Sequence, residues 1–120
     1  MQYLLMIYED EKIWDAFTDA DKGRIFQEYG AFTAAIKESG HFVAGDALQP
    51  IATATTVRNR EGKVLSTDGP FAETREQLGG YYIIDAKDLD EAITIAARIP
   101  PATKGTIEIR PILELSGLPE

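Results

Sequence analysis

The residues of this chain that could do chemistry gather in one short stretch. Asp68-Gly69-Pro70-Phe71 supplies a carboxylate, a stiff turn and an aromatic ring, and Glu73 adds another carboxylate. Proline fixes φ and glycine permits unusual φ, so this loop would hold Asp68 at a set angle and aim Phe71 inward. Two interpretations stay open. Asp68 is an acid–base group or ligand anchor, or it accepts hydrogen bonds within its own loop.

Two further groups could take part in acid–base chemistry. If residues 72–78 form a helical turn, Glu73 and Glu76 lie on one side of it and can perturb each other's pKa. A solvated turn with Arg75 as counter-charge is the simpler interpretation. His41 is the only histidine, and it is a candidate general base. A partly exposed histidine at a strand edge is the more common role.

Composition excludes several function classes. The chain has 120 residues, enough for one domain, and a formal charge of −8, which disfavours nucleic-acid backbones and anionic membranes. It has no cysteine, so disulfides, thiolate nucleophiles and cysteine-bound zinc are excluded. No phosphate-binding glycine motif, nucleophile elbow or metal-ligand spacing is present, so we expect no cofactor and no metal. The start lacks the features of a signal peptide, and no apolar run approaches about 20 residues, so we expect a cytoplasmic protein.

Hydrophobic periodicity predicts the elements that must position these residues. Residues 3–8 are continuously apolar, which favours a strand covered on both faces, and the acidic residues 9–11 that follow should be solvated. A helix should run from a Thr18 cap to Gly40, because Ile25, Tyr29, Phe32 and Ile36 form one stripe. The remaining predictions are a strand at 41–44, a hairpin at 53–58 and 63–67, a strand at 81–85, a helix from an Asp88 cap to Pro100, and a strand at 106–115. In this last strand, Pro111 suggests either a sheet edge or a point of strand exchange.

This order of elements predicts an α+β fold, a ferredoxin-like βαββαβ unit with an extra hairpin. Two helices can cover only one face of its sheet. The other face would expose Tyr81, Tyr82 and the isoleucines and leucines of the last strand, which is unfavourable. We therefore expect a homodimer that buries this face and encloses clefts at its interface.

The run from Asp68 to Tyr82 closely resembles the signature of the DGPF domain family, within the wider YCII-related superfamily. The resemblance extends over nearly the whole chain, including residues 3–8, 29–32, 53–58 and 108–111. It implies a single domain over residues 1–120 and a dimeric α+β barrel. Some relatives look like lyases or dehalogenases that use a His–Asp pair. The position of their histidine falls on Tyr29 here, so this mechanism is not carried over directly, and Asp46 and Asp68 are both candidates for their aspartate.

Three hypotheses for function follow. The first is a small-molecule site in a cleft between the sheet and the first helix, with elimination or isomerisation as the reaction. Its catalytic candidates are Asp68, Tyr29 and His41, and its ligand-binding candidates are Phe71, Glu73 and Arg58. The second is a non-enzymatic regulatory or binding module, because similar family members occur beside extracytoplasmic-function sigma factors. The third is a stable dimer whose signature segment serves only to fold it.

Overall fold

The computed structural model describes residues 1–115, which form an α+β arrangement of helices and antiparallel strands. The helices are α1 (Glu11–Asp15), α2 (Asp19–Glu38) and α3 (Leu89–Ala96), with a 3-10 turn at Ile51–Thr53. The strands are β1 (Gln2–Glu9), β2 (Phe42–Ala47), β3 (Thr55–Arg60), β4 (Lys63–Asp68), β5 (Gln77–Asp85) and β6 (Thr106–Pro111). No helix among these residues is both long enough and apolar enough to cross a membrane.

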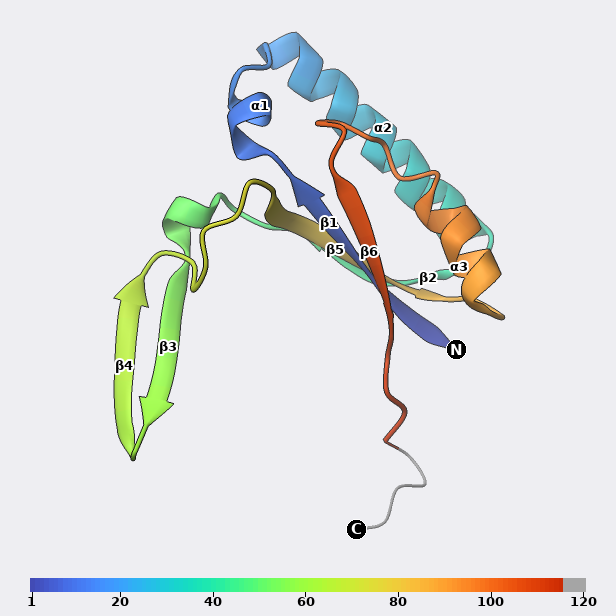
Figure 1. Ribbon diagram of the computed structural model, residues 1–120. Coiled ribbons are helices and arrows are strands. Elements are labelled where there is room, and N and C mark those ends of the chain that lie inside the picture. The colour runs from blue at the N-terminus through green and yellow to red at the C-terminus, as the bar shows by residue number, and fades with distance from the viewer. Residues whose placement is uncertain (116–120) are drawn as a thin grey trace.

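Four of the strands form one antiparallel sheet in the order β2-β5-β1-β6, and α2 and α3 lie together on one of its faces (Figure 1). β6 is an edge strand, as Pro111 suggested, because proline has no N–H to donate to a further neighbour. The strand ends at Pro111, so it is shorter than predicted.

The first strand is covered on one face only. Tyr3, Leu5 and Ile7 are buried beneath the helices, whereas the alternate residues Leu4 and Met6 are only half-buried. The prediction that this strand is covered on both faces is therefore wrong for the single chain. A continuous apolar run had suggested it, but the alternation of side chains divides that run between two faces.

The face turned away from the helices, here called the open face, carries apolar residues from the two central strands. Strand register places Leu4 opposite Ile83 and Met6 opposite Tyr81, with Tyr8 next along β1. The expectation that the last strand contributes its isoleucines to this face is wrong. Its isoleucines pack on the helix side, and so does Tyr82.

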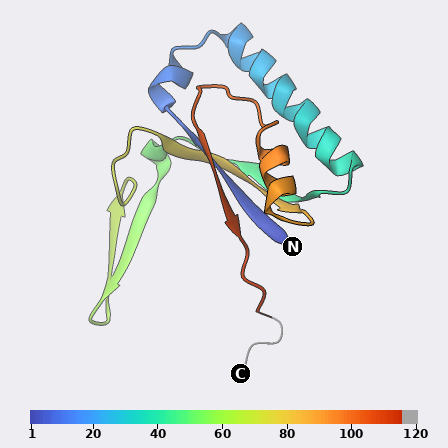
Figure 2. The ribbon, with the colours of Figure 1, turned by 45° about the vertical axis from the view of Figure 1, so that its right-hand side comes forward.

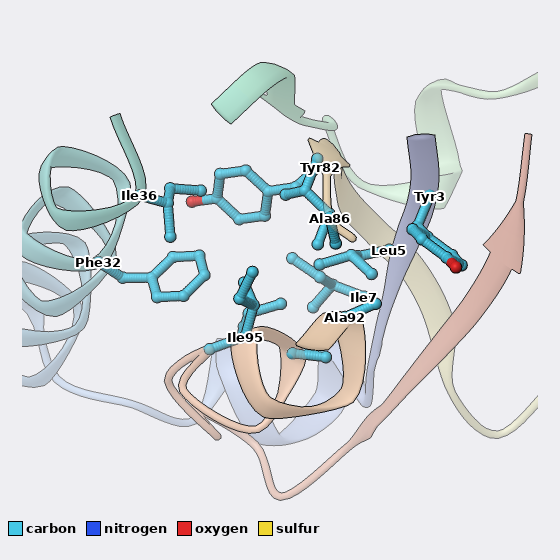
Figure 3. Close-up of a cluster of buried hydrophobic side chains, with 12 residues drawn as sticks. Tyr3, Leu5, Ile7, Phe32, Ile36, Tyr82, Ala86, Ala92 and Ile95 are labelled. Atoms are coloured by element: carbon cyan, nitrogen blue, oxygen red, sulfur yellow. The ribbon is translucent and has the colours of Figure 1, made fainter. Parts of the chain in front are cut away.

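Buried side chains from β1, β5, α2 and α3 form one core between the sheet and the helices (Figure 3). Leu5, Ile36 and Ile84 are its most completely buried large side chains. The ring of Tyr82 extends from β5 toward α2 and packs edge-on against the Phe32 ring (Figure 3). The two ring centroids lie 5.3 Å apart.

The long helix α2 begins and ends as the sequence predicted. The Thr18 hydroxyl accepts from the Asp21 backbone N–H, and the Asp21 carboxylate accepts from Thr18 in return. Both bonds satisfy N–H groups that lack partners at a helix start. Gly40 follows the helix with φ 81°, the left-handed conformation that glycine adopts most easily.

The predicted hairpin is present, but it stands apart from the main sheet. β3 and β4 pair only with each other, and residues 55–68, here called the arm, project on the side of the sheet away from the helices (Figures 1 and 2). Residues 69–76, which follow the arm, form no helix. The helical turn on which a Glu73–Glu76 pair depended is therefore absent, and the Glu76 carboxylate accepts from the Thr106 hydroxyl at 2.8 Å.

Candidate functional site

A pocket of about 450 Å³ lies between α2 and the β2–β5 half of the sheet. Its size falls within the range of small-molecule sites. Aromatic residues form much of its wall: Trp14, Phe26, Tyr29, Phe42 and Tyr82.

The pocket exists because two adjacent strands carry very small residues where the helix passes over them. Strand register places Gly45 opposite Tyr82 and Ala47 opposite Gly80, all on the helix side. A Cβ at Gly45 would lie 2.6 Å from the Tyr82 ring, and one at Gly80 would lie 3.1 Å from the Asp46 carbonyl oxygen. Glycine therefore permits both the close packing of these strands and the space above them.

Glu9 and Tyr29 form the main polar pair of the pocket. The Tyr29 hydroxyl lies 3.1 Å from Glu9 Oε1 and 3.2 Å from the Pro100 carbonyl oxygen, so its single proton faces two acceptors. Tyr29 comes from the apolar stripe of α2, and Glu9 is the last residue of β1. The strand alternation of Tyr3, Leu5 and Ile7 continues to Glu9, which brings its carboxylate to the helix side.

Burial changes the proton affinity of both groups. Removal of water raises the pKa of Glu9, and the hydrogen bond from Tyr29 partly opposes this effect. The pKa of Tyr29 is raised strongly, first by burial and then by the charge and hydrogen bond of Glu9. Tyr29 therefore stays protonated near neutral pH and acts as a donor. Glu9 takes up a proton more readily than a solvated carboxylate does, which suits it to proton transfer.

Other hydrogen bonds hold the walls in place. The Thr33 hydroxyl donates to the Tyr29 carbonyl oxygen at 2.8 Å, so the Tyr82 hydroxyl donates to Thr33 at 2.7 Å. The Tyr81 hydroxyl donates to Asp46 at 2.6 Å, and this bond raises the pKa of Tyr81. The first pair of bonds holds the Tyr82 ring of β5 against α2, and the Tyr81–Asp46 bond joins β5 to β2 on the opposite face of the sheet.

The short helix α1 forms the mouth of the pocket. The Trp14 ring packs edge-on against the Phe26 ring of α2, with 5.5 Å between the ring centroids. Glu11 accepts from the Ile51 backbone N–H at 2.8 Å, and its own N–H donates to the Gln77 side chain at 3.0 Å. These contacts tie α1 to the loop after β2 and to the start of β5.

Among the six residues predicted for catalysis or ligand binding, only Tyr29 lines this pocket; of the two candidates for the relatives' aspartate, Asp46 lines it and Asp68 does not. Arg58 and Asp68 lie on the arm, and Phe71 and Glu73 follow it; all four are exposed, Phe71 to 80%. The expectation that Phe71 points inward is wrong for the single chain. Their proposed roles in binding and catalysis stay predictions.

Hydrogen bonds from groups other than the Asp68 carboxylate hold the loop at Asp68 in place. The Gly69 N–H donates to the Ala54 carbonyl oxygen at 2.7 Å, and the Thr56 hydroxyl donates to the Gly69 carbonyl oxygen at 2.7 Å. Within residues 1–115, the Asp68 carboxylate accepts no hydrogen bond, so the interpretation that it satisfies its own loop gains no support.

His41 lies outside the pocket, between the end of α2 and the start of α3. Its Nδ1 lies 2.7 Å from the Ser39 hydroxyl, and its Nε2 lies 3.1 Å from Glu91 Oε1. These contacts connect the α2–β2 turn to the first turn of α3. Its predicted role as a general base is untested, and this geometry gives it a structural role.

The sequence prediction missed Glu9, which it grouped with a solvated acidic patch. The structure places it half-buried. Its parity with Tyr3, Leu5 and Ile7 along the strand was the signal that could have identified it. Across the described part of the chain, no group of three or more His, Cys, Asp or Glu side chains is placed to hold a metal ion.

Comparison with known proteins identifies the family. The model of the YCII-related domain matches residues 1–116. The chain is also 35% identical over 114 residues to an uncharacterized protein, R00369, of Rhizobium meliloti (strain 1021), a match that covers 93% of this chain and 92% of that protein. The chain therefore belongs to the YCII-related domain family, and the relative's name states no activity.

Proposed function

We infer that this protein binds a small molecule in the pocket between α2 and the sheet and transfers a proton to or from it. The observation that carries this inference is the half-buried Glu9–Tyr29 pair within an aromatic pocket of about 450 Å³. A carboxyl group with a raised pKa can transfer a proton, and a tyrosine that stays protonated near neutral pH can donate a hydrogen bond to an oxygen of the ligand. Elimination and isomerisation are two reactions that such groups can catalyse without a cofactor.

The lining of the pocket indicates the kind of ligand. Aromatic rings favour a flat, largely apolar body. Glu9 has no ion-pair partner among the described residues, so it is free to accept a hydrogen bond or proton from a hydroxyl or amine of the ligand. A small phenol, enol or aromatic amine meets both requirements.

The molecule that binds this ligand is a homodimer with a ferredoxin-like fold in each subunit. The strand order β2-β5-β1-β6, with α2 and α3 on one face, supports the fold. The apolar open face supports the dimer, because pairing two such faces removes Leu4, Met6 and Ile83 from water. The two paired sheets would form an α+β barrel.

A ligand screen with three variants tests the site. Thermal shift against a library of small phenols, enols and aromatic amines should identify compounds that raise Tm. Glu9→Gln and Tyr29→Phe should abolish that rise, whereas Asp68→Asn should retain it. Proton NMR of a bound compound in deuterated buffer should then show exchange of a carbon-bound proton.

The opposite result, in which the Asp68 variant loses the ligand, would place the site outside the pocket. If Asp68→Asn loses the ligand and the pocket variants keep it, the arm loop holds the site and this proposal is wrong. Binding without any exchange or turnover would make the protein a binding module instead of an enzyme.

A further inference from the structure

We propose that the arm of each chain clasps the body of a second copy. This inference rests on the proposed homodimer and goes beyond it, because it places the arm in the dimer interface together with the open face.

The arm has no core of its own. A two-stranded hairpin surrounded by water is marginally stable at best. Every residue of β4 is exposed. In β3, Thr56 is half-buried and the other residues are exposed. Val57 and Val64 are 63% and 69% exposed, which is unfavourable for a strand pair that ends in solvent.

Both faces of the arm carry side chains that a partner can bury or pair. Register places Val57 opposite Ser66 and Val64 opposite Asn59, so both valines lie on one face. The other face carries Leu65 and the basic residues Arg58, Arg60 and Lys63. A hairpin held between two bodies would use both faces.

The charge of the arm complements that of the rest of the chain. The arm holds three of the 12 basic residues and only two of the 20 acidic ones. The remainder of the chain is therefore strongly acidic. Asp46 and Glu108 are exposed acidic residues that strand register places on the open face, at its two margins. A basic arm is attracted to such a surface on another copy.

The chain exposes more surface than a compact monomer of its size. Its accessible surface is 8668 Å², whereas a compact monomer of its 13.2 kDa mass exposes about 6,400 Å². The excess of roughly 2,300 Å² is larger than the ~800 Å² that each partner buries in a standard interface. The radius of gyration is 16.8 Å, against about 13.6 Å for a compact domain of this length.

The position of the arm suits a clasp. It projects on the same side of the sheet as the open face, away from α2 and α3 (Figures 1 and 2). At its base, the Gly69 N–H donates to the Ala54 carbonyl oxygen and the Thr56 hydroxyl donates to the Gly69 carbonyl oxygen, both at 2.7 Å, so the two strands stay joined down to the end of the arm. Two copies that meet at their open faces would each extend an arm along the other, a reciprocal arrangement that two-fold symmetry permits.

Site-specific photo-crosslinking tests the clasp. Because the chain has no cysteine, Val64→Cys creates a single thiol on the arm, which can carry a benzophenone. Ala31→Cys, exposed on α2, is the matched control. We expect the arm label to join two chains, with adducts mapped by mass spectrometry to the body of the second copy, and the control label to leave single chains.

Charge reversal gives an independent measurement. The double variant Arg58→Glu, Arg60→Glu should raise the dimer dissociation constant by roughly tenfold or more, measured by sedimentation equilibrium. The reason is that the two new carboxylates are repelled by the acidic surface that attracts the two arginines. Lys12→Glu with Lys87→Glu, two exposed positions off the arm, changes net charge equally and should leave the dissociation constant unchanged.

Hydrogen exchange of the unmodified protein completes the test. The amides of β3 and β4 should exchange more slowly as protein concentration rises through the dissociation constant. A wild-type dimer whose arm amides exchange quickly at every concentration, and whose arm label captures no second chain, would overturn the clasp and leave the homodimer standing. A wild-type monomer would overturn the homodimer itself.

Discussion

The carboxyl group of Glu9 lies half-buried in the pocket, where the Tyr29 hydroxyl is its hydrogen-bond donor. Burial of a carboxylate disfavours its charged form, so the folded protein holds a proton on Glu9 at a higher pH than the unfolded chain does. Stability from this group is fully present below its unfolded pKa, near 4.5, and is lost as pH rises through the higher folded pKa.

We predict that Glu9→Gln raises Tm at pH 7 and that its Tm converges with that of the wild type as pH falls to about 4. The amide keeps an oxygen that accepts from Tyr29 but carries no charge. Thermal melts between pH 4 and 8 measure this difference. Glu28→Gln, an exposed change on α2, should alter Tm little at any pH. A Glu9→Gln variant less stable than the wild type at pH 7 would contradict the assigned burial effect.

We predict that Tyr29→Phe raises the pKa of Glu9 further, because the Tyr29 hydrogen bond is the influence that lowers it. The same change leaves the Pro100 carbonyl oxygen without this donor, so the free energy of unfolding should fall by about 1 kcal/mol. Carbon-13 NMR titration of the Glu9 carboxyl and urea unfolding measure the two effects. An unchanged Glu9 pKa would show that the two side chains do not interact in solution.

At the scale of elements, the pocket depends on how closely β2 approaches β5 beneath α2. Gly45 on β2 allows the Tyr82 ring to lie over the strand, and that ring carries the hydroxyl that reaches Thr33. By contrast, a Cβ at Gly23 in α2 would meet nothing within 4 Å.

These two glycines give a matched pair of predictions with opposite signs. Gly45→Ala should lower the free energy of unfolding by about 1–3 kcal/mol, because its methyl group displaces the Tyr82 ring. Gly23→Ala should raise it by up to about 1 kcal/mol, because alanine favours the helix and has free space. Chemical unfolding of both variants measures the two changes in the free energy of unfolding. Stabilisation by Gly45→Ala would show that the strand and ring are not packed as described.

At the scale of the whole molecule, the helices cover one face of the sheet and leave the other apolar. Met6 lies near the centre of the open face, opposite Tyr81. A positive charge introduced there could not be buried between two copies without a large desolvation cost.

We predict that Met6→Arg converts the proposed dimer to a monomer at micromolar concentration, measured by sedimentation velocity. Ala31→Arg, on the opposite, helix-covered side, should retain the wild-type mass. Circular dichroism of both variants checks that each is folded. A folded Met6→Arg variant with the wild-type dimeric mass would place the interface on another surface.

The sequence alone determined the features that depend on near neighbours along the chain. The Thr18 cap, the Gly40 termination of α2, the arm hairpin and the edge position of Pro111 each follow from local backbone geometry and hydrogen bonding. Periodicity also predicted the apolar stripe of α2, and so placed Tyr29 toward the sheet.

Only the tertiary structure decided which of these residues meet. The pocket requires small residues on β2 and β5, which are distant in sequence, to lie side by side under one stretch of α2. Glu9 gains its raised pKa from that enclosure, and the residues around Asp68 lie outside it because the arm projects away from the body. Spacing along a chain fixes which way a side chain faces on its own element, but burial and proton affinity depend on the other elements that pack around it.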